Sequence, residues 1–274
     1  MTSWDTGYAE SDGERIYWER AGEGIPIVLC HGAGSNHLSF YHQVPGLSAA
    51  GHQVIVWDQR GYGNSTLATG EVGVTAAGRD LTAVLEANAL GSAPVHLVGQ
   101  ALGALVVSAW AVANPQRVLS VSMLDGPFAA SPDGSELIWT LEATDDDVHS
   151  TQVDRQVGRT VGVSAAFAER DPAGTYLYQT LQELGNTKPS YSQLFAAAKS
   201  EPVSLEQFAS LDLPVLIGRG EYDQLANADA LDRLASLLPR ASRVTIPGAG
   251  HSPYIESPTE WNRSILAFID GSHA

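Results

Sequence analysis

PVHLVGQALGALVV, residues 94–107, contains two different hydrophobic patterns in immediate succession. Its first half is a short aliphatic run typical of a buried strand, and its second half has apolar residues at helical spacing. Gly99 and Gly103 lie two positions to either side of Ala101, where side chains would collide in a sharp strand-to-helix turn. The stretch therefore predicts a buried strand, a strained turn centred on Ala101, and a helix.

The same alternation of short apolar runs and longer helical stretches extends along most of the chain. An antiparallel hairpin with Asp12-Gly13 at its turn is expected near the start. Because the runs of Val, Ile and Leu are nearly continuous, the later strands should be buried on both faces. The sequence predicts an α/β fold: a mostly parallel sheet of about eight strands, covered by helices on both faces. We expect strands at residues 25–30, 53–58, 94–99, 118–124, 214–218 and 243–246, and helices at residues 75–90, 102–114, 227–238 and from Ser257 onward.

One segment interrupts this alternation. No convincing strand separates Leu124 from Pro214, and this stretch is too long for a loop in a compact domain. We therefore predict a helical cap, or lid, at residues 128–206. It is inserted after the sixth strand, into a core domain formed by residues 1–127 and 207–274. Ligands of open α/β sheets bind at the carboxyl edge of the strands, so the cap should cover that edge.

The composition favours a soluble globular protein and excludes several classes of partner. Asp and Glu outnumber Lys and Arg by 31 to 15, a formal net charge of −16, which argues against nucleic acid and anionic membranes as partners. Cys30 is the only cysteine, so neither an internal disulfide nor a multi-cysteine zinc site can form. No apolar run is long enough to span a bilayer, and the N-terminal residues do not resemble a signal peptide. We expect a cytoplasmic protein that uses no metal or other cofactor.

Four motifs, in a fixed order, give the chain a family resemblance. They are His31-Gly32-Ala33-Gly34 after one strand, Asp58-Gln-Arg-Gly-Tyr-Gly-Asn-Ser65 after the next, Gly99-Gln-Ala-Leu-Gly103, and Gly248-Ala-Gly-His251 followed by Glu256 and Pro258. Together they resemble the oxyanion loop, the D-x-R-G-x-G-x-S turn, the G-x-S-x-G nucleophile elbow and the catalytic-histidine loop of the α/β-hydrolase superfamily. The resemblance covers the chain apart from the predicted cap.

This resemblance assigns the parts of a Ser-His-Asp site to particular residues. His251 matches the general base, which takes the proton of the nucleophile and needs a carboxylate to fix its tautomer. We favour Asp223 as that carboxylate, because it follows a strand at the place where the family usually has its acid. Asp125, after the preceding strand of the sheet, is the alternative. The backbone N–H groups of Ala33 and Leu102 match the oxyanion donors.

Ala101 occupies the position of the nucleophile, and a methyl group cannot attack a carbonyl carbon. Either a native serine has been replaced by alanine, or a natural lineage has lost its nucleophile. The strained turn costs about 1–3 kcal/mol, which a native alanine would carry without return, so we favour replacement. A lost aspartate nucleophile, as in epoxide hydrolases and haloalkane dehalogenases, is disfavoured because those relatives usually have proline in the oxyanion loop.

The predicted activity is hydrolysis of an ester, lactone or similar carbonyl, in a form that Ala101 makes inactive. Aromatic residues of the cap, Phe167 and Tyr178 among them, favour a small-molecule substrate that is apolar or aromatic and of moderate size. Three alternatives stay open: a carbon–carbon bond hydrolase, a cofactor-independent oxygenase of an N-heteroaromatic substrate, and a non-catalytic ligand-binding homologue. A homodimer is compatible with the sequence. The candidate substrate-binding residues are Gln100, Phe128, Trp139, His37 and Tyr222.

Overall fold

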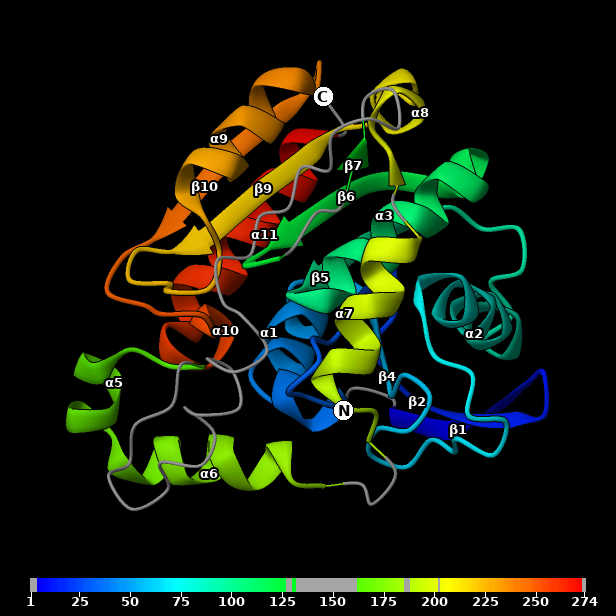
Figure 1. The fold of residues 1–274 in the computed structure, drawn as a ribbon, viewed down its shortest axis with the longest axis horizontal. Coiled ribbons are helices and arrows are strands. Elements are labelled where there is room, and N and C mark those ends of the chain that lie inside the picture. Colours follow the sequence, from blue (N-terminus) through cyan, green and yellow to red (C-terminus); the bar gives the residue numbers. More distant parts are fainter. Residues whose placement is uncertain (1–3, 127–129, 132–161, 185–187, 202, 273–274) are drawn as a thin grey trace.

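A twisted sheet of eight strands runs through the centre of the molecule (Figure 1). The computed structural model describes residues 4–126, 130–131, 162–184, 188–201 and 203–272. The strands follow one another across the sheet in the order β1 (Trp4–Ser11), β2 (Glu14–Ala21), β4 (Gln53–Trp57), β3 (Pro26–Cys30), β5 (Val95–Gln100), β6 (Val118–Leu124), β9 (Val215–Gly220) and β10 (Ala241–Ile246).

The direction of the strands agrees with the sequence pattern. β2 is antiparallel to β1 and β4, and the other neighbouring pairs are parallel. Asp12 and Gly13 turn the opening hairpin with φ angles of 49° and 84°, as a two-residue turn of this hand requires. The prediction of a mostly parallel sheet of about eight strands is confirmed.

Helices cover both faces of the sheet, because successive side chains of a strand point to opposite sides. One layer contains η1 (His37–Phe40), α1 (Gln43–Ala49), α10 (Pro253–Glu256) and α11 (Pro258–Ser272). The other contains α2 (Val74–Ala87), α3 (Leu102–Ala113), α8 (Leu205–Ser210) and α9 (Ala228–Leu237), and η2 (Pro115–Arg117) leads into β6. In β3, Ile27 and Leu29 belong to the cluster of the first layer, whereas Val28 and Cys30 belong to that of the second.

Between β6 and β9 the chain leaves the sheet and forms α5 (Ala165–Arg170), α6 (Pro172–Gln182) and α7 (Tyr191–Ser200). Helix α7 lies against α3 (Figure 1), and Leu194 of α7 belongs to one apolar cluster with Leu102 and Leu105 of α3. The expectation that this region contains no strand needs correction, because β7 (Ala130–Ser131) and β8 (Val203–Ser204) form a separate parallel pair. Residue 128, where we place the start of the cap, lies outside the described residues.

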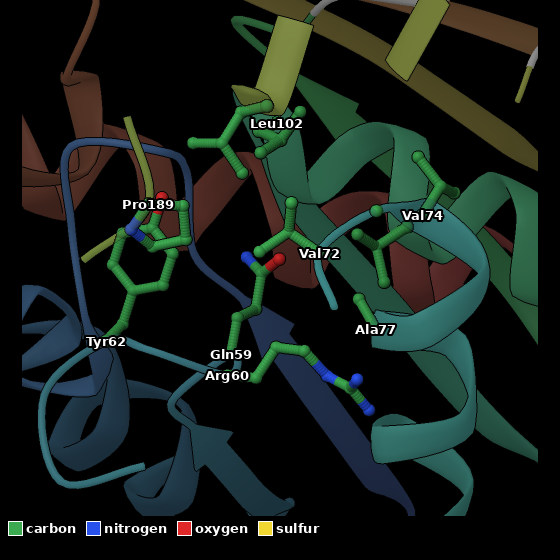
Figure 2. Close-up of a pocket in the computed structure, with 11 residues that line it drawn as sticks. Gln59, Arg60, Tyr62, Val72, Val74, Ala77, Leu102 and Pro189 are labelled. Carbon is green, nitrogen blue, oxygen red and sulfur yellow. The ribbon is translucent and has the colours of Figure 1, made fainter. Parts of the chain in front are cut away.

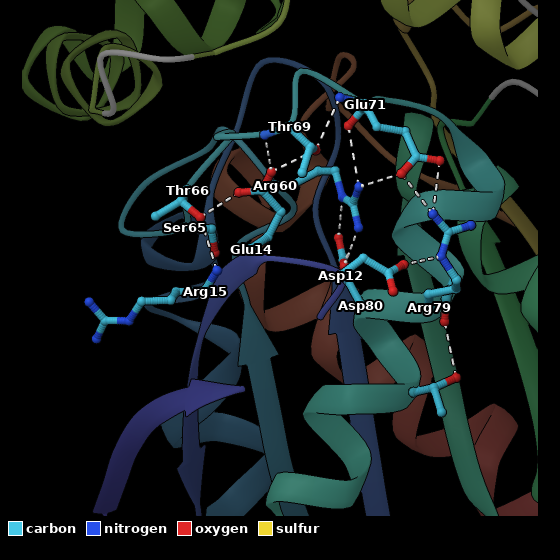
Figure 3. Close-up of polar contacts among 12 residues, drawn as sticks. Asp12, Glu14, Arg15, Arg60, Ser65, Thr66, Thr69, Glu71, Arg79 and Asp80 are labelled. Atoms are coloured by element: carbon cyan, nitrogen blue, oxygen red, sulfur yellow. Dashed lines mark hydrogen bonds and ion pairs between the residues drawn. The ribbon is translucent and has the colours of Figure 1, made fainter. Parts of the chain in front are cut away.

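Ion pairs fix the turn that follows β4 (Figure 3). The buried guanidinium of Arg60 donates to both carboxylate oxygens of Asp80 in α2, with N–O distances of 2.8 and 2.6 Å. Glu71 links Arg60 to Arg79, at N–O distances of 3.2 and 2.8 Å. The side chains of this turn therefore hold it against α2, so that Arg60 is structural.

Glu14, at the start of β2, fixes the other side of the same turn (Figure 3). Its buried carboxylate accepts hydrogen bonds from the hydroxyls of Thr66 and Thr69 and from the backbone N–H groups of Ala68 and Thr69. Burial alone would raise the pKa of this carboxyl group, but these hydrogen bonds lower the pKa of Glu14 to about 2.

Within the described residues, no helix is both long and apolar enough to cross a bilayer.

Candidate active site

The sharp turn at Ala101 connects β5 to α3. Ala101 has φ 47° and ψ −123°, a conformation that residues other than glycine rarely adopt. Its backbone N–H donates to the carbonyl of Leu124 at 2.8 Å, and its carbonyl accepts from the N–H of Ala104 at 2.9 Å. The turn is thus bonded to β6 on one side and to the first turn of α3 on the other.

Gly99 and Gly103 are required by close packing around this turn. A Cβ atom on Gly99 would lie 2.4 Å from the carbonyl oxygen of Gly103, and one on Gly103 would lie 2.2 Å from the carbonyl oxygen of Cys30. Both distances are far below a van der Waals contact, so a side chain at either position would push the turn out of place. The predicted reason for the two glycines is confirmed.

The His251 ring lies against Asp223 at the carboxyl edge of the sheet. Its Nδ1 is 3.1 Å from both carboxylate oxygens of Asp223. Oδ1 of Asp223 also accepts the backbone N–H groups of Leu225 and Ala226, at 2.8 and 3.1 Å. Burial alone would raise the pKa of Asp223, but His251 and these amides lower the pKa below its ordinary value. This geometry lets Asp223 hold Nδ1 protonated and leaves Nε2 as the basic nitrogen.

Asp125, the alternative acid, lies beside Asp223. Its side chain is completely buried, and its Oδ1 accepts the backbone N–H of Gly220 at 2.8 Å. Burial raises the pKa of Asp125 well above its ordinary value, and the neighbouring charge of Asp223 raises it further. The structure therefore pairs His251 with Asp223, and Asp125 supports the loop on which Asp223 lies.

The loop of residues 31–34 lies against the turn at Ala101. A Cβ atom on Gly32 would be 2.7 Å from the Cβ of Ala101. The backbone N–H groups of Ala33 and Leu102, our expected oxyanion donors, make no hydrogen bond to another described residue. Amides fixed by the backbone and free of internal acceptors are the kind of donor that stabilises a developing oxyanion.

Two side chains fix the loop that carries His251. The side-chain amide of Gln100 donates to the carbonyl of His251 at 3.0 Å, although we expected Gln100 to contact substrate. Glu256 accepts the N–H of Gly250 with one oxygen and the N–H of Ser164 with the other, both at 2.9 Å. The sequence indicated Glu256 only as part of a motif. Its hydrogen bond with the N–H of Ser164 could not be predicted, because the two residues lie far apart in the chain.

His37 has a different environment from the one expected. Its Nδ1 is 2.8 Å from both carboxylate oxygens of Asp58, and its Nε2 is 3.4 Å from Oε1 of Glu19. Burial lowers the pKa of a histidine, yet these two carboxylates raise the pKa of His37 to about 9. A buried, doubly paired imidazolium has no free ring nitrogen for a substrate, so the structure does not support His37 as a binding residue.

No contact among the described residues assigns a binding role to the other aromatic residues that we expected near the substrate. Tyr222 is 54% exposed, immediately before Asp223 on the same loop. Phe128 and Trp139 lie outside the described residues. Phe167 and Tyr178 are buried in the apolar core cluster that includes α10 and α11, so they serve packing. The hydroxyl of Tyr178 also accepts a hydrogen bond from Ser252, beside His251, at 3.0 Å, and no sequence pattern indicated this contact.

Figure 2 shows a small cavity between α2, α3 and the segment leading into α7. It has a volume of about 20 Å³ and is lined by Tyr62, Val74, Leu102 and Leu194, among others. That is room for about one water molecule, so this cavity is not where a substrate of moderate size binds.

Among the described residues, no three His, Cys, Asp or Glu side chains are arranged to hold a metal ion.

The fold and this site define a class of protein. The profile of the family described as alpha/beta hydrolase fold matches residues 25–258, and the chain belongs to this family. The chain is 27% identical over 257 residues to a pimeloyl-[acyl-carrier protein] methyl ester esterase from Aeromonas hydrophila, covering 92% of this chain and 98% of the relative.

A second relative is a 2-hydroxy-6-oxononadienedioate/2-hydroxy-6-oxononatrienedioate hydrolase from Pseudomonas putida. It is 26% identical over 273 residues, covering 93% of this chain and 91% of the relative. Among solved structures, a thermophilic esterase from Thermogutta terrifontis has a TM-score of 0.80 at 19% identity, covering 98% of this chain and all of the esterase chain. Family and relatives identify the chain as a hydrolase.

Proposed function

We propose that this protein is a carbonyl hydrolase of the serine type, acting on an ester or lactone, in which Ala101 takes the place of the nucleophilic serine. The observation that carries the proposal is the pairing of His251 Nδ1 with Asp223, at 3.1 Å from both carboxylate oxygens. The loop of the base is hydrogen-bonded to the residue before Ala101, because the side-chain amide of Gln100 donates to the carbonyl of His251.

The mechanism follows from the placement of these groups. In the form with serine at position 101, Nε2 of His251 takes the hydroxyl proton while the oxygen attacks the carbonyl carbon. Asp223 keeps Nδ1 protonated and stabilises the imidazolium. The N–H groups of Ala33 and Leu102 donate to the oxyanion. The imidazolium then protonates the leaving group, and water, activated by the same ring, hydrolyses the acyl-enzyme.

The backbone at Ala101 supports serine as the original residue. A φ of 47° costs a residue with a side chain about 1–3 kcal/mol. For a nucleophile that cost has a return, because the turn presents the side chain at the edge of the sheet beside the N–H groups of Ala33 and Leu102. For alanine it has none. With a methyl group at this position, we expect the chain to bind its substrate without turning it over.

The test is the variant Ala101→Ser, assayed with p-nitrophenyl acetate and p-nitrophenyl butyrate. Because removing a serine nucleophile typically costs 10⁴-fold or more in rate, we expect a gain on the order of 10⁴–10⁶ over the Ala101 protein. Ala101→Ser combined with His251→Gln is the matched control and should lose this gain. A folded serine variant as silent as the Ala101 protein would overturn the proposal.

A second candidate is hydrolysis of a carbon–carbon bond by the same residues. The observation in its favour is the similarity, over 93% of this chain, to the hydrolase from Pseudomonas putida. The two candidates separate in one experiment, in which Ala101→Ser is given activated esters and, in parallel, a vinylogous 1,5-diketone. Preference for the diketone, with little turnover of either ester, would favour carbon–carbon cleavage.

A further inference from the structure

Two carboxyl groups share the buried space behind His251. Asp125 follows β6 and Asp223 follows β9, and these strands are neighbours in the sheet, with Leu124 opposite Gly218. The Asp125 side chain is completely buried and Asp223 is 6% exposed. The backbone of Asp125 has φ 51° and donates its N–H to the carbonyl of Gly218 at 2.8 Å. The sheet thus brings the two acids together from distant parts of the chain.

The hydrogen bonds of the two acids are very unequal. The carboxylate of Asp223 faces three donors: the amides of Leu225 and Ala226, and the ring N–H of His251. Asp125 receives only the N–H of Gly220, on Oδ1, and no donor of the described residues reaches its buried Oδ2. The carboxyl group of Asp223 is close enough to that of Asp125 for a hydrogen bond between the two side chains, and the charge of Glu256 also acts on Asp125.

Two ionised carboxylates cannot form a hydrogen bond with each other, because each is only an acceptor. If Asp125 carried a charge, that charge would be buried, with one amide for compensation and a second anion beside it. A proton on Asp125 removes the charge and turns the contact with Asp223 into a strong hydrogen bond to an anion. The raised pKa of Asp125 and the lowered pKa of Asp223 agree with this division of roles.

We propose that Asp125 is a neutral carboxylic acid at neutral pH, and that it positions Asp223 by donating a hydrogen bond to its carboxylate. It holds the acid loop at two points, the N–H of Gly220 and the side chain of Asp223. A second anion beside Asp223 would further stabilise the imidazolium, so that less of the ring would be in the neutral form that accepts a proton. The positioning role rests on the proposed function, but the protonation of Asp125 does not.

Protonation is tested in the Ala101 protein itself, by difference infrared spectroscopy and by NMR titration of the His251 ring. At pH 7, we expect a carboxylic-acid C=O band that disappears in Asp125→Asn and survives in Asp270→Asn, a control at an exposed acid. Asp125→Asn replaces a neutral group with a neutral group, so the titration midpoint of His251 should move by less than about 0.3 unit. Absence of the band, or a fall in that midpoint by about one unit or more, would overturn the proposal.

The positioning role is tested in the Ala101→Ser background. Asp125→Leu keeps the branching at Cγ, although it is larger, and has no donor, so kcat should fall about 10- to 100-fold with little change in KM. Asp125→Asn, which can still donate to Asp223 and accept from Gly220, should rescue most of this loss. Equal losses in both variants, at matched folding, would contradict positioning by hydrogen-bond donation. If the serine variant has no activity at all, the proposed function fails, while the infrared and NMR results still decide the protonation of Asp125.

Discussion

The side-chain amide of Gln100 lies 3.0 Å from the carbonyl oxygen of His251 and donates a hydrogen bond to it. Gln100 is the last residue of β5 and directly precedes Ala101, so this bond connects the nucleophile position to the loop of the base. Positions 101 and 251 are far apart in the sequence, and this buried hydrogen bond joins their two segments directly.

Removal of this bond should impair catalysis more than folding. In the Ala101→Ser background, we expect Gln100→Ala to lower kcat/KM about 10- to 100-fold, because the His251 loop loses its anchor. The free energy of unfolding should fall by only about 1–2 kcal/mol, the price of one buried hydrogen bond. Ester hydrolysis and urea unfolding measure the two effects. A loss of stability without a loss of rate would show that Gln100 only packs.

Asp223 should be the acid on which catalysis depends. Asp223→Asn in the Ala101→Ser background should lower kcat by about 10⁴-fold, because an amide favours the wrong imidazole tautomer. The matched control is Asp229→Asn, at an exposed acid in the first turn of α9, which should have no measurable effect. A rate loss below tenfold for Asp223→Asn would remove Asp223 from the triad.

Relief of strain at position 101 should stabilise the protein. Glycine adopts φ 47° without steric penalty, so Ala101→Gly should raise the free energy of unfolding by about 1 kcal/mol. Ala111→Gly, a buried helical position in α3 where alanine is the better residue, should instead lower it by about that amount or more. Equilibrium unfolding in urea compares the two. A destabilising Ala101→Gly would mean that the turn carries little strain.

Because of His37, the free energy of unfolding should fall as pH rises from neutral to alkaline values. Its pKa is raised from 6.5 to about 9 in the folded protein, because the carboxylates of Asp58 and Glu19 outweigh the effect of burial. The folded state therefore binds the proton more tightly than the unfolded state. This contribution is fully present below pH 6.5 and is lost as pH rises through about 9. Unfolding free energies of the protein and of His37→Gln, measured from pH 6 to 10, should converge toward the alkaline end. Parallel curves would contradict a charged His37.

The local signals in the sequence were sufficient for most of the fold. Gly99 and Gly103 located the turn at Ala101, since the steric reason for them is contained in one short segment. The alternation of aliphatic strands and helices gave the sheet and its hairpin. The pair β7–β8 was missed because two residues on each side carry no periodicity.

The side-chain partners of the site were harder to predict, because they depend on which strands are neighbours. Both Asp125 and Asp223 follow strands, and no local sequence pattern shows that Asp223, and not Asp125, contacts His251. The strand order and the amides around Asp223 make that distinction. His37 was similarly ambiguous, because Asp58 and Glu19, which occupy its two nitrogens, come from other elements.

The chain departs from the sheet at Leu124 and returns to it at Val215, and these two strands, β6 and β9, are hydrogen-bonded to each other. The described part of the segment between them adds no strand to the eight-stranded sheet. An excursion with adjacent ends can be lengthened, shortened or exchanged without changing which strands are paired. The registers that place Asp125 beside Asp223 would be inherited intact by a chimaera that carried another protein's cap. The segment between β6 and β9 can therefore be exchanged by grafting while the sheet that carries Asp125, Asp223 and His251 keeps its strand pairing.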